Sequence, residues 1–421
     1  MEDKVGKIWM ERCGEFIREH RSDDVRRLAL QAGRYPDVDM PFVLQQIAGW
    51  QVARTKLPSW AAVEDICYPP HISMEQCSSE QTAQYKASLM SRISGDSEVL
   101  VDLTGGFGVD FSYMSCGFQR AVYVERQEQL CEVARHNFRL LQLENSEVVC
   151  GDGEEYLHQI PAGMRVCIYL DPARRDLQGK KTYAISDCTP DVLTLKDELL
   201  QKASCVMVKL SPMLDWHKAV DDLGDVREVH IVSVGNECKE LLVVLGACGT
   251  GQEETVVVPE DAVRVYCVNI LGNGRMEMFE FKYPSGVSTA GESGFAFSGE
   301  HAGLFLYEPN ASLMKAGCFA ELARCYAVQP VSRSSHLFVS DHLVNDIPCR
   351  KFQISAVSTM NKKQLKTALQ GLTKANIAVR NFPLSVAELR KRLKLADGGD
   401  IYVFATTDQT GEHVLLFSKK V

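Results

Sequence analysis

Between residues 98 and 245, short apolar segments alternate with stretches of helical periodicity, and this alternation constrains the fold of the 421-residue chain more than any other feature. Seven strands are expected, at 98–102, 120–125, 147–150, 166–171, 204–209, 228–234 and 241–245. Helices are predicted over 111–116, 127–141 and 189–201. Because strands that alternate with helices form a parallel sheet covered by helices, the sequence predicts an α/β, doubly wound domain.

The rest of the chain differs in character on either side of this region. Apolar side chains at three- and four-residue spacing predict a helical N-terminal domain over 1–94. The doubly wound domain is assigned to 95–250, and an α+β connecting domain to 251–345. Alternating strand and helix patterns predict a compact α+β domain over 346–421.

Within the connecting domain, residues 254–258 and 262–269 are strand-like, and the turn Gly272-Asn-Gly predicts a hairpin. Residues 284–299 are rich in Gly and Ser and are interpreted as a loop or linker.

Composition excludes several classes of protein. With 45% apolar residues and 24% charged residues, the chain has the composition of a globular protein. Its longest strongly apolar stretch, 241–248, is far shorter than the ~20 residues of a membrane span, and its first residues lack the apolar core of a secretory signal.

Fifteen cysteines include no C-x-x-C pair, so reduced thiols without a metal site are expected. The expected location is the cytoplasm, with no membrane partner.

Positive charge is concentrated near the C-terminus. Residues 350–394 contain eleven Lys and Arg against one acid, Glu388, whereas the whole chain has a net charge of −9. A cationic segment in an acidic protein indicates a polyanionic partner, for which nucleic acid is the natural candidate. The alternative is that the Lys-rich faces of two amphipathic helices are simply solvated.

A glycine-rich turn follows the first predicted strand of the α/β domain, in Val99-Leu-Val-Asp-Leu-Thr-Gly-Gly-Phe-Gly108. Glycines leave the backbone accessible to a ligand, and the start of the next helix offers free N–H groups. The dinucleotide fingerprint G-x-G-x-x-G needs a small residue three positions after Gly108, where this chain has Phe111. The turn therefore predicts a ligand site, but not one for NAD or FAD.

The turn resembles the first motif, D/E-x-x-x-G-x-G, of class I methyltransferases that depend on S-adenosylmethionine (SAM). Glu125, 23 residues after Asp102, closes the next predicted strand, where an acid can accept hydrogen bonds from both ribose hydroxyls. The resemblance implies that Asp152 binds the adenine amino group and that Asp171 ends the fourth strand. The SAM site is expected to comprise Asp102, Thr104, Gly105, Gly106, Gly108, Glu125, Arg126, Asp152, Gly153 and Asp171.

Asp171-Pro-Ala-Arg174 resembles the D/N-P-P-Y/F/W motif of amino-methylating enzymes, whose first residue grips the target NH2. The resemblance implies that Asp171 and Arg174 are catalytic and that Asp171 orients an exocyclic amine of a base. Ala173 and Arg174 replace the second proline and the aromatic residue of the motif. Arg174 could stack through its guanidinium plane or bind a phosphate, which leaves the target atom open.

The same string is similar to the motif of RNA 5-methyluridine methyltransferases, which attack the pyrimidine through a cysteine. Their cysteine lies in a Ser-Cys-Asn-Pro-like segment, and the counterpart here is Lys209-Leu-Ser-Pro212. Leu210 fills the cysteine position, and the nearest thiol, Cys205, lies inside a predicted strand and is interpreted as core. Carbon methylation is therefore disfavoured.

As a whole, the chain resembles a bacterial family of SAM-dependent methyltransferases with a THUMP-like C-terminal domain. The segments that carry the resemblance are Ser78–Lys86, Asp102–Asp110, Asp171–Arg174, Arg380–Pro383 and Asp397–Asp400. Because THUMP domains recognise RNA, the resemblance implies methylation of RNA, either rRNA or tRNA, at an exocyclic base nitrogen. The expected RNA contacts are Arg174, Arg175, Lys362, Lys363, Lys366, Arg380, Arg390 and Lys391.

Two other functions stay open at this point. The chain could methylate a protein or a small molecule, with the C-terminal domain as an oligomerisation unit, or it could be a noncatalytic RNA-binding module that retains a SAM site. Tyr85 and Lys86 are expected either to close over the cofactor or to belong to a surface helix. His136 and Asn137 are interpreted as helix packing.

Overall fold

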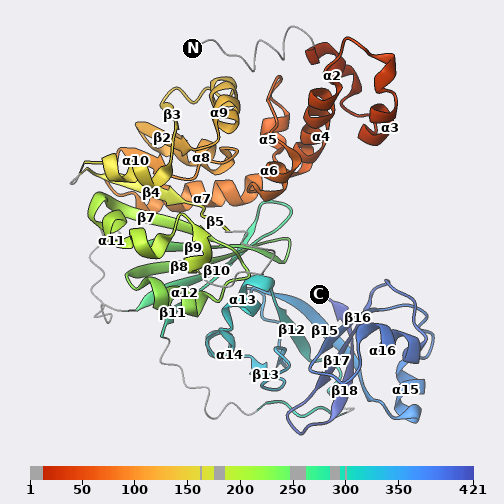
Figure 1. The fold of residues 1–421 in the computed structure, drawn as a ribbon. Helices are drawn as coiled ribbons and strands as arrows, with labels where there is room; N and C mark the ends of the chain where they lie inside the picture. Colours follow the sequence, from red (N-terminus) through yellow and green to blue (C-terminus); the bar gives the residue numbers. More distant parts are fainter. Residues whose placement is uncertain (1–12, 162–163, 175–184, 247–261, 285–293, 299–300) are drawn as a thin grey trace. The chain divides into compact units, whose positions relative to one another are not determined.

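The computed structural model describes residues 13–161, 164–174, 185–246, 262–284, 294–298 and 301–421. The strand expected at 254–258 and most of the Gly/Ser-rich stretch 284–299 lie outside the described residues. Figure 1 shows the fold. The chain divides into two compact units, Met1–His230 with Lys239–Val263 and Ile231–Cys238 with Arg264–Val421, and we describe each by itself. The four-domain division expected from the sequence stays a prediction.

The first unit is built on a central sheet. Seven strands of this nine-stranded sheet lie next to one another in the order β8-β9-β7-β4-β1-β2-β3. Their bounds are Val99–Asp102 (β1), Arg120–Glu125 (β2), Ser146–Cys150 (β3), Val166–Leu170 (β4), Ala203–Leu210 (β7), Val226–Val234 (β8) and Glu237–Leu245 (β9). All five residues of β4 are buried, as expected of a strand covered on both faces. Each strand predicted between 98 and 245 is present, within a few residues of its expected bounds.

One strand departs from the expected parallel arrangement. β1 pairs in parallel with β2 and β4, and β4 pairs in parallel with β7, but β9 pairs antiparallel with β7. Only Gly235 and Asn236 separate β8 from β9, and both have positive φ, 56° and 68°. A two-residue turn of this kind closes a hairpin and is far too short for a crossover between parallel strands.

Helices surround this sheet and precede it (Figure 1). The described part of residues 1–94 contains helices and no strand, as predicted: Gly14–His20 (α2), Val25–Leu30 (α3), Met40–Lys56 (α4), Pro58–Ala61 (α5), His71–Gln76 (α6) and Glu80–Ile93 (α7). The helices between strands are Val109–Met114 (α8), Glu128–Leu140 (α9), Gly153–Gln159 (α10), Val192–Lys202 (α11) and Trp216–Leu223 (α12). Several begin at an acidic cap; for example, Asp39 accepts a hydrogen bond from the Phe42 N–H at the start of α4.

Polar contacts connect α9 to the loop between α5 and α6. The Asn137 amide bonds both the N–H and the carbonyl of Cys67, each at 2.9 Å, and His136 Nε2 lies 2.8 Å from the carbonyl oxygen of Asp65. Asn137 is fully buried. These contacts agree with the interpretation of His136 and Asn137 as packing residues.

The second unit contains a mixed seven-stranded sheet in the order β13-β14-β12-β15-β18-β17-β16. Its strands are Phe305–Pro309 (β12), Gln329–Pro330 (β13), Phe338–Ser340 (β14), Cys349–Thr359 (β15), Asn376–Arg380 (β16), Ile401–Thr407 (β17) and His413–Lys420 (β18). Its helices are Ala311–Ala316 (α13), Phe319–Tyr326 (α14), Lys362–Ala368 (α15) and Val386–Leu393 (α16). The strands Val263–Ile270 (β10) and Met276–Tyr283 (β11) flank the predicted Gly272-Asn-Gly turn.

Among the described residues, no helix combines the length and the apolar character needed to cross a membrane.

Candidate active site

Four acidic residues lie at the carboxyl ends of four neighbouring strands. Asp102 is the last residue of β1, Glu125 is the last of β2, Asp152 follows β3 by two residues, and Asp171 directly follows β4. The strands are adjacent in the order β4-β1-β2-β3 and are parallel to one another. Parallel strands present their carboxyl ends at one edge of the sheet, so the fold brings these four predicted site residues to one edge, where doubly wound sheets bind ligands.

The glycine-rich turn between β1 and α8 lies beside these acids, and packing requires its glycines. A Cβ on Gly105 would come within 2.2 Å of the Tyr123 ring. Gly108, the residue before α8, has φ +84°, and a Cβ there would come within 2.8 Å of the Phe138 ring. Close packing of the turn against β2 and α9 therefore explains part of the motif, in addition to access for a ligand.

Two backbone N–H groups, one in this turn and one just after β2, orient Glu125. Its Oε2 accepts a hydrogen bond from the Gly106 N–H at 3.0 Å, and its Oε1 accepts one from the Gln127 N–H at 2.8 Å. A carboxylate has about four acceptor positions, so two such bonds leave Glu125 with capacity for two further donors. The carboxylate is thus fixed against the turn with acceptor capacity to spare.

The end of β3 supplies the next part of the site. Asp152 caps α10: its Oδ1 accepts hydrogen bonds from the N–H groups of Glu154 at 2.8 Å and Glu155 at 3.3 Å. A Cβ on Gly153 would come within 2.2 Å of the Leu103 carbonyl oxygen, so only glycine fits beside the chain leaving β1. Arg126 follows β2 and is exposed.

Asp171 is held from two sides. Its N–H donates to Thr104 Oγ1 at 2.6 Å, which connects the end of β4 to the glycine-rich turn. Its carboxylate Oδ2 accepts a hydrogen bond from Lys209 Nζ at 2.5 Å. Asp171 stays partly exposed, with 38% of its side chain accessible, whereas the Lys209 side chain is 14% accessible. The result is an oriented, partly exposed carboxylate at this edge of the sheet, bonded to a largely buried lysine.

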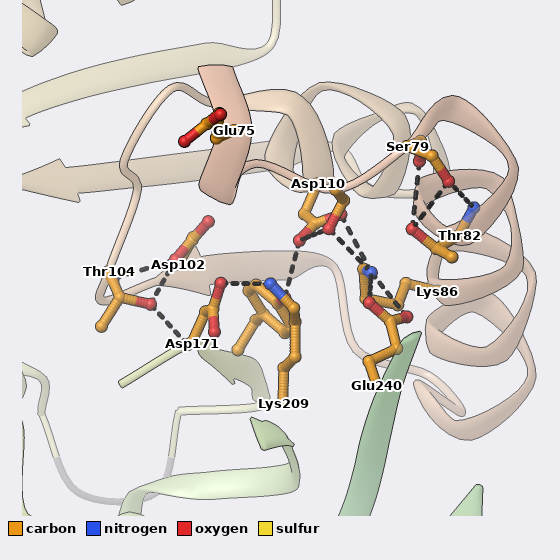
Figure 2. Close-up of polar contacts among 12 residues, drawn as sticks. Glu75, Ser79, Thr82, Lys86, Asp102, Thr104, Asp110, Asp171, Lys209 and Glu240 are labelled. Carbon is orange, nitrogen blue, oxygen red and sulfur yellow. Dashed lines mark hydrogen bonds and ion pairs between the residues drawn. The ribbon is translucent and has the colours of Figure 1, made fainter. Parts of the chain in front are cut away.

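Behind this pair lies a buried charge cluster that the sequence did not predict, consisting of Lys86, Asp110, Lys209 and Glu240 (Figure 2). Lys86 is fully buried and bonds both carboxylate oxygens of Glu240 at 2.7 Å. Its Nζ also lies 3.2 Å from Asp110 Oδ1, an ion-pair contact without hydrogen-bond geometry. Lys86 is therefore a structural cation of the core, which differs from both roles that the sequence suggested for it.

Asp110 connects this cluster to the sheet and to α7. Its Oδ2 accepts hydrogen bonds from the hydroxyls of Ser78 and Tyr169, both at 2.8 Å. Burial alone would raise the pKa of Asp110, but Lys86 and Lys209 lower it below its ordinary value. The one available sequence signal was that Lys86 and Asp110 end two of the segments that carry the family resemblance.

Tyr85, beside Lys86 on α7, is also buried. Its hydroxyl lies 2.7 Å from His230 Nδ1, and His230 Nε2 lies 3.1 Å from Glu228 Oε2. Arg92, also on α7, forms an ion pair with the same Glu228 carboxylate. The helix is thus fixed to β8 and β9 by polar contacts along its buried face.

Asp102 has an electrostatic environment unlike that of the other acids. Its Oδ1 accepts a hydrogen bond from the Thr104 N–H at 2.9 Å, but the residue is only 1% exposed. Burial raises the pKa of Asp102 to about 8; the Thr104 bond opposes the shift, and the charges of Asp110 and Asp171 add to it. An ammonium group placed against this carboxyl would stabilise its ionised form.

The raised pKa of Asp102 predicts a pH-dependent stability. Asp102 binds its proton more tightly in the folded than in the unfolded chain, so its contribution to stability is complete below pH 3.8 and is lost as the pH rises through about 8. In urea unfolding without ligand, the stability of the wild type relative to Asp102→Asn should therefore fall over this range. A difference between the two proteins that stays constant with pH would contradict the assignment.

The predicted RNA-contacting residues occupy different settings. Arg174 lies in the short strand β5 (Ala173–Arg174), paired with β6 (Cys188–Thr189), and Arg175 lies outside the described residues. In the second unit, Lys362, Lys363, Lys366 and Lys391 are exposed on α15 and α16.

Two of the predicted arginines already have acidic partners. Arg380 Nη2 bonds the buried Glu308 at 2.9 Å, and Arg390 Nη2 bonds Asp397 at 2.6 Å. Arg390 Nη1 also donates to the Ala375 carbonyl at 3.1 Å. The predicted RNA contacts of the second unit therefore fall into two groups: lysines that are exposed, and arginines that form bonds within the domain.

Family comparisons match the second unit. A family described as THUMP domain-like matches residues 349–420, which span β15 to β18, and a family described as a ferredoxin-like domain matches residues 305–348. Among proteins with curated descriptions, none matches the chain.

Solved structures extend the likeness to the whole chain. A crystal structure described as a "putative methyltransferase from Porphyromonas gingivalis W83" has 31% sequence identity and a TM-score of 0.80, and the match covers 100% of this chain and 99% of that chain. The chain belongs to the family of that protein, a bacterial class I methyltransferase family with a THUMP-like C-terminal domain, as the sequence predicted.

More distant structures match only part of the chain. An rRNA methylase from Streptococcus thermophilus has 15% identity and a TM-score of 0.30, with 38% of this chain and 93% of that chain covered. An O-methyltransferase from Bacillus cereus, in complex with SAH, has 10% identity and a TM-score of 0.31, with 48% and 91% covered.

Proposed function

We propose that this protein is a SAM-dependent methyltransferase that modifies RNA, either rRNA or tRNA, at an exocyclic base nitrogen. The observation that carries the proposal is the placement of Asp102, Glu125, Asp152 and Asp171 at one edge of the sheet around the glycine-rich turn. This edge is where doubly wound sheets bind their ligands.

The acidic side chains at this edge can accept the hydrogen bonds that SAM would donate. Glu125, with acceptor capacity to spare, would bind the ribose hydroxyls, and Asp152 would accept from the adenine amino group. The buried carboxyl of Asp102 would lie against the ammonium group of the methionine moiety, whose positive charge would oppose the rise of the Asp102 pKa and favour its ionised form. The bound sulfonium supplies an electrophilic methyl group.

The chain's own residues would then act mainly by positioning the acceptor nitrogen against the methyl group. A methyl sulfonium reacts readily once a nucleophile is held in line with it, so fixing the acceptor provides most of the catalysis. Asp171, oriented by Thr104 and Lys209, would accept a hydrogen bond from the target amine and hold its nitrogen in line with the methyl group. The N–C bond would form as the S–C bond of the sulfonium breaks, the demethylated thioether would leave, and the amine would lose one proton to solvent. Arg174, which replaces the aromatic residue of the amino-methylating motif, would bind the base or a neighbouring phosphate.

The RNA substrate is supported by the THUMP-like match and by the exposed lysines within it. Lys362, Lys363 and Lys366 all lie on α15, so one helix presents three ammonium groups. Such a group suits a phosphate backbone, whereas Arg380 and Arg390 are engaged with Glu308 and Asp397.

Removal of these three lysines should weaken RNA binding and its salt dependence together. If each contacts one phosphate of single-stranded RNA, replacing all three by Gln lowers the slope of log K against log salt by about 2. The control is a triple variant at Lys218, Lys239 and Lys282, which are exposed outside the THUMP-like match. Equal salt slopes for the two variants would contradict a role for α15.

The overall proposal is tested by transfer of a labelled methyl group from SAM to RNA from a deletion strain, followed by mass spectrometry of its nucleosides. We expect label in one N-methylated nucleoside that the deletion strain lacks. Label in protein or in a small molecule would replace the RNA assignment, and SAM binding without transfer to any of these would favour a noncatalytic module.

A further inference from the structure

The lysine next to the end of β7 bonds a side chain of the candidate active site. Lys209 Nζ bonds Asp171 Oδ2 at 2.5 Å, and Lys209 lies in the segment Lys209–Pro212 that was compared with a nucleophile motif. In that comparison Leu210 occupied the cysteine position, and the structure has Leu210 buried. Lys209 of this segment thus has a polar contact with a side chain at the site edge.

We propose that Lys209 is a positioning residue for methyl transfer, which holds the Asp171 carboxylate in the orientation that receives the target amine. This inference rests on the proposed function, in which Asp171 contacts the acceptor. With Oδ2 bonded to Lys209 and the Asp171 N–H bonded to Thr104, Asp171 has a fixed side chain and a fixed backbone. Its Oδ1 is then the oxygen left to accept from the amine.

The buried charge cluster explains why Lys209 keeps its charge. Burial alone would lower the pKa of Lys209, but the carboxylates of Asp171, Asp110 and Glu240 raise it above its ordinary value. Lys209 therefore stays an ammonium and acts neither as a base nor as a nucleophile. Asp110 and Glu240 are in turn held by Lys86, so α7 supports the site from behind.

The arrangement also explains how a partly exposed acid is held still. An exposed ion pair between two flexible side chains is weakly ordered and contributes little energy. Here the lysine side chain is only 14% accessible and the Asp171 side chain is 38% accessible, so the pair has one largely buried partner; Figure 2 shows Lys209 bonded to Asp171. A small displacement of that carboxylate would displace the acceptor nitrogen, and about 1 Å of misplacement lowers a rate by roughly 100-fold.

The test is a double-mutant cycle with Lys209→Met and Asp171→Asn, read as kcat for methyl transfer to RNA. Met keeps most of the volume of lysine and removes its charge. We expect Lys209→Met to lower kcat by about 100-fold in the wild type but by far less in the Asp171→Asn background, because the effect passes through the Asp171 carboxylate. Affinity for SAH should change little, and Lys209→Arg should restore part of the lost kcat.

Each outcome of the cycle has a distinct meaning. Equal losses in both backgrounds, or a loss of SAH affinity that matches the loss of kcat, would overturn the positioning role. Lys218→Met, an exposed lysine of the same unit paired with Asp222, controls for loss of a charged side chain and should be as active as the wild type. If the wild type and this control transfer no methyl group to RNA, the proposed function fails, and this inference fails with it.

Discussion

Replacing Asp171 with alanine is expected to lower the rate of methyl transfer by about 100-fold or more, because the acceptor amine then has no fixed oxygen at the carboxyl end of β4. SAH should still bind, since Glu125 and Asp152, on β2 and after β3, are unchanged by the substitution. The measurement is single-turnover transfer of labelled methyl to RNA, together with the dissociation constant of SAH.

Asp225→Ala is the control for this prediction. Asp225 is a 54% exposed acid of the same unit, paired with Lys196, and its loss should leave the rate unchanged. An Asp171→Ala protein that transfers methyl groups as fast as the wild type would remove Asp171 from the mechanism.

Replacing Lys86 with methionine is expected to produce the largest loss of stability among the substitutions considered. Removal of one partner of a buried ion pair leaves the other charge uncompensated and destabilises a protein by about 3–5 kcal/mol. Here Lys86 bonds both oxygens of the buried Glu240 and lies beside Asp110. Urea unfolding followed by circular dichroism measures the effect.

The double variant Lys86→Met/Glu240→Gln separates this cause from a general loss of packing. It removes the stranded carboxylate, so it should recover a substantial part of the stability that Lys86→Met loses. Lys218→Met, at an exposed pair, should lie within about 1 kcal/mol of the wild type. Equal stability of Lys86→Met and Lys218→Met would show that the buried cluster does not stabilise the fold.

Much of the fold could be predicted because its strands are strongly apolar and separated by clear turns. β4, with all residues buried, and β2, with five of six buried, stand out in the sequence as continuous hydrophobic runs. The antiparallel direction of β9 could also have been predicted, since Gly235-Asn236 is a hairpin signal between two strands.

One part of the candidate site could be predicted from the sequence, and another part could not. The placement of Asp102, Glu125, Asp152 and Asp171 follows from strand order, so a local pattern together with a parallel sheet suffices to predict it. The Lys86–Glu240 pair joins residues that are 154 positions apart, and nothing in the local sequence around either one predicts its partner. Contacts of this kind depend on tertiary packing, and a single sequence contains little signal for them.

The proposed function depends on binding of SAM by the acidic side chains at the carboxyl ends of β4, β1, β2 and β3. Isothermal titration of the purified full-length protein with SAH tests it most directly, with Glu125→Ala as the comparison. We expect one SAH per chain for the wild type and markedly weaker binding for Glu125→Ala. A folded wild-type protein that gives no binding signal, or equal affinities for the two proteins, would contradict it.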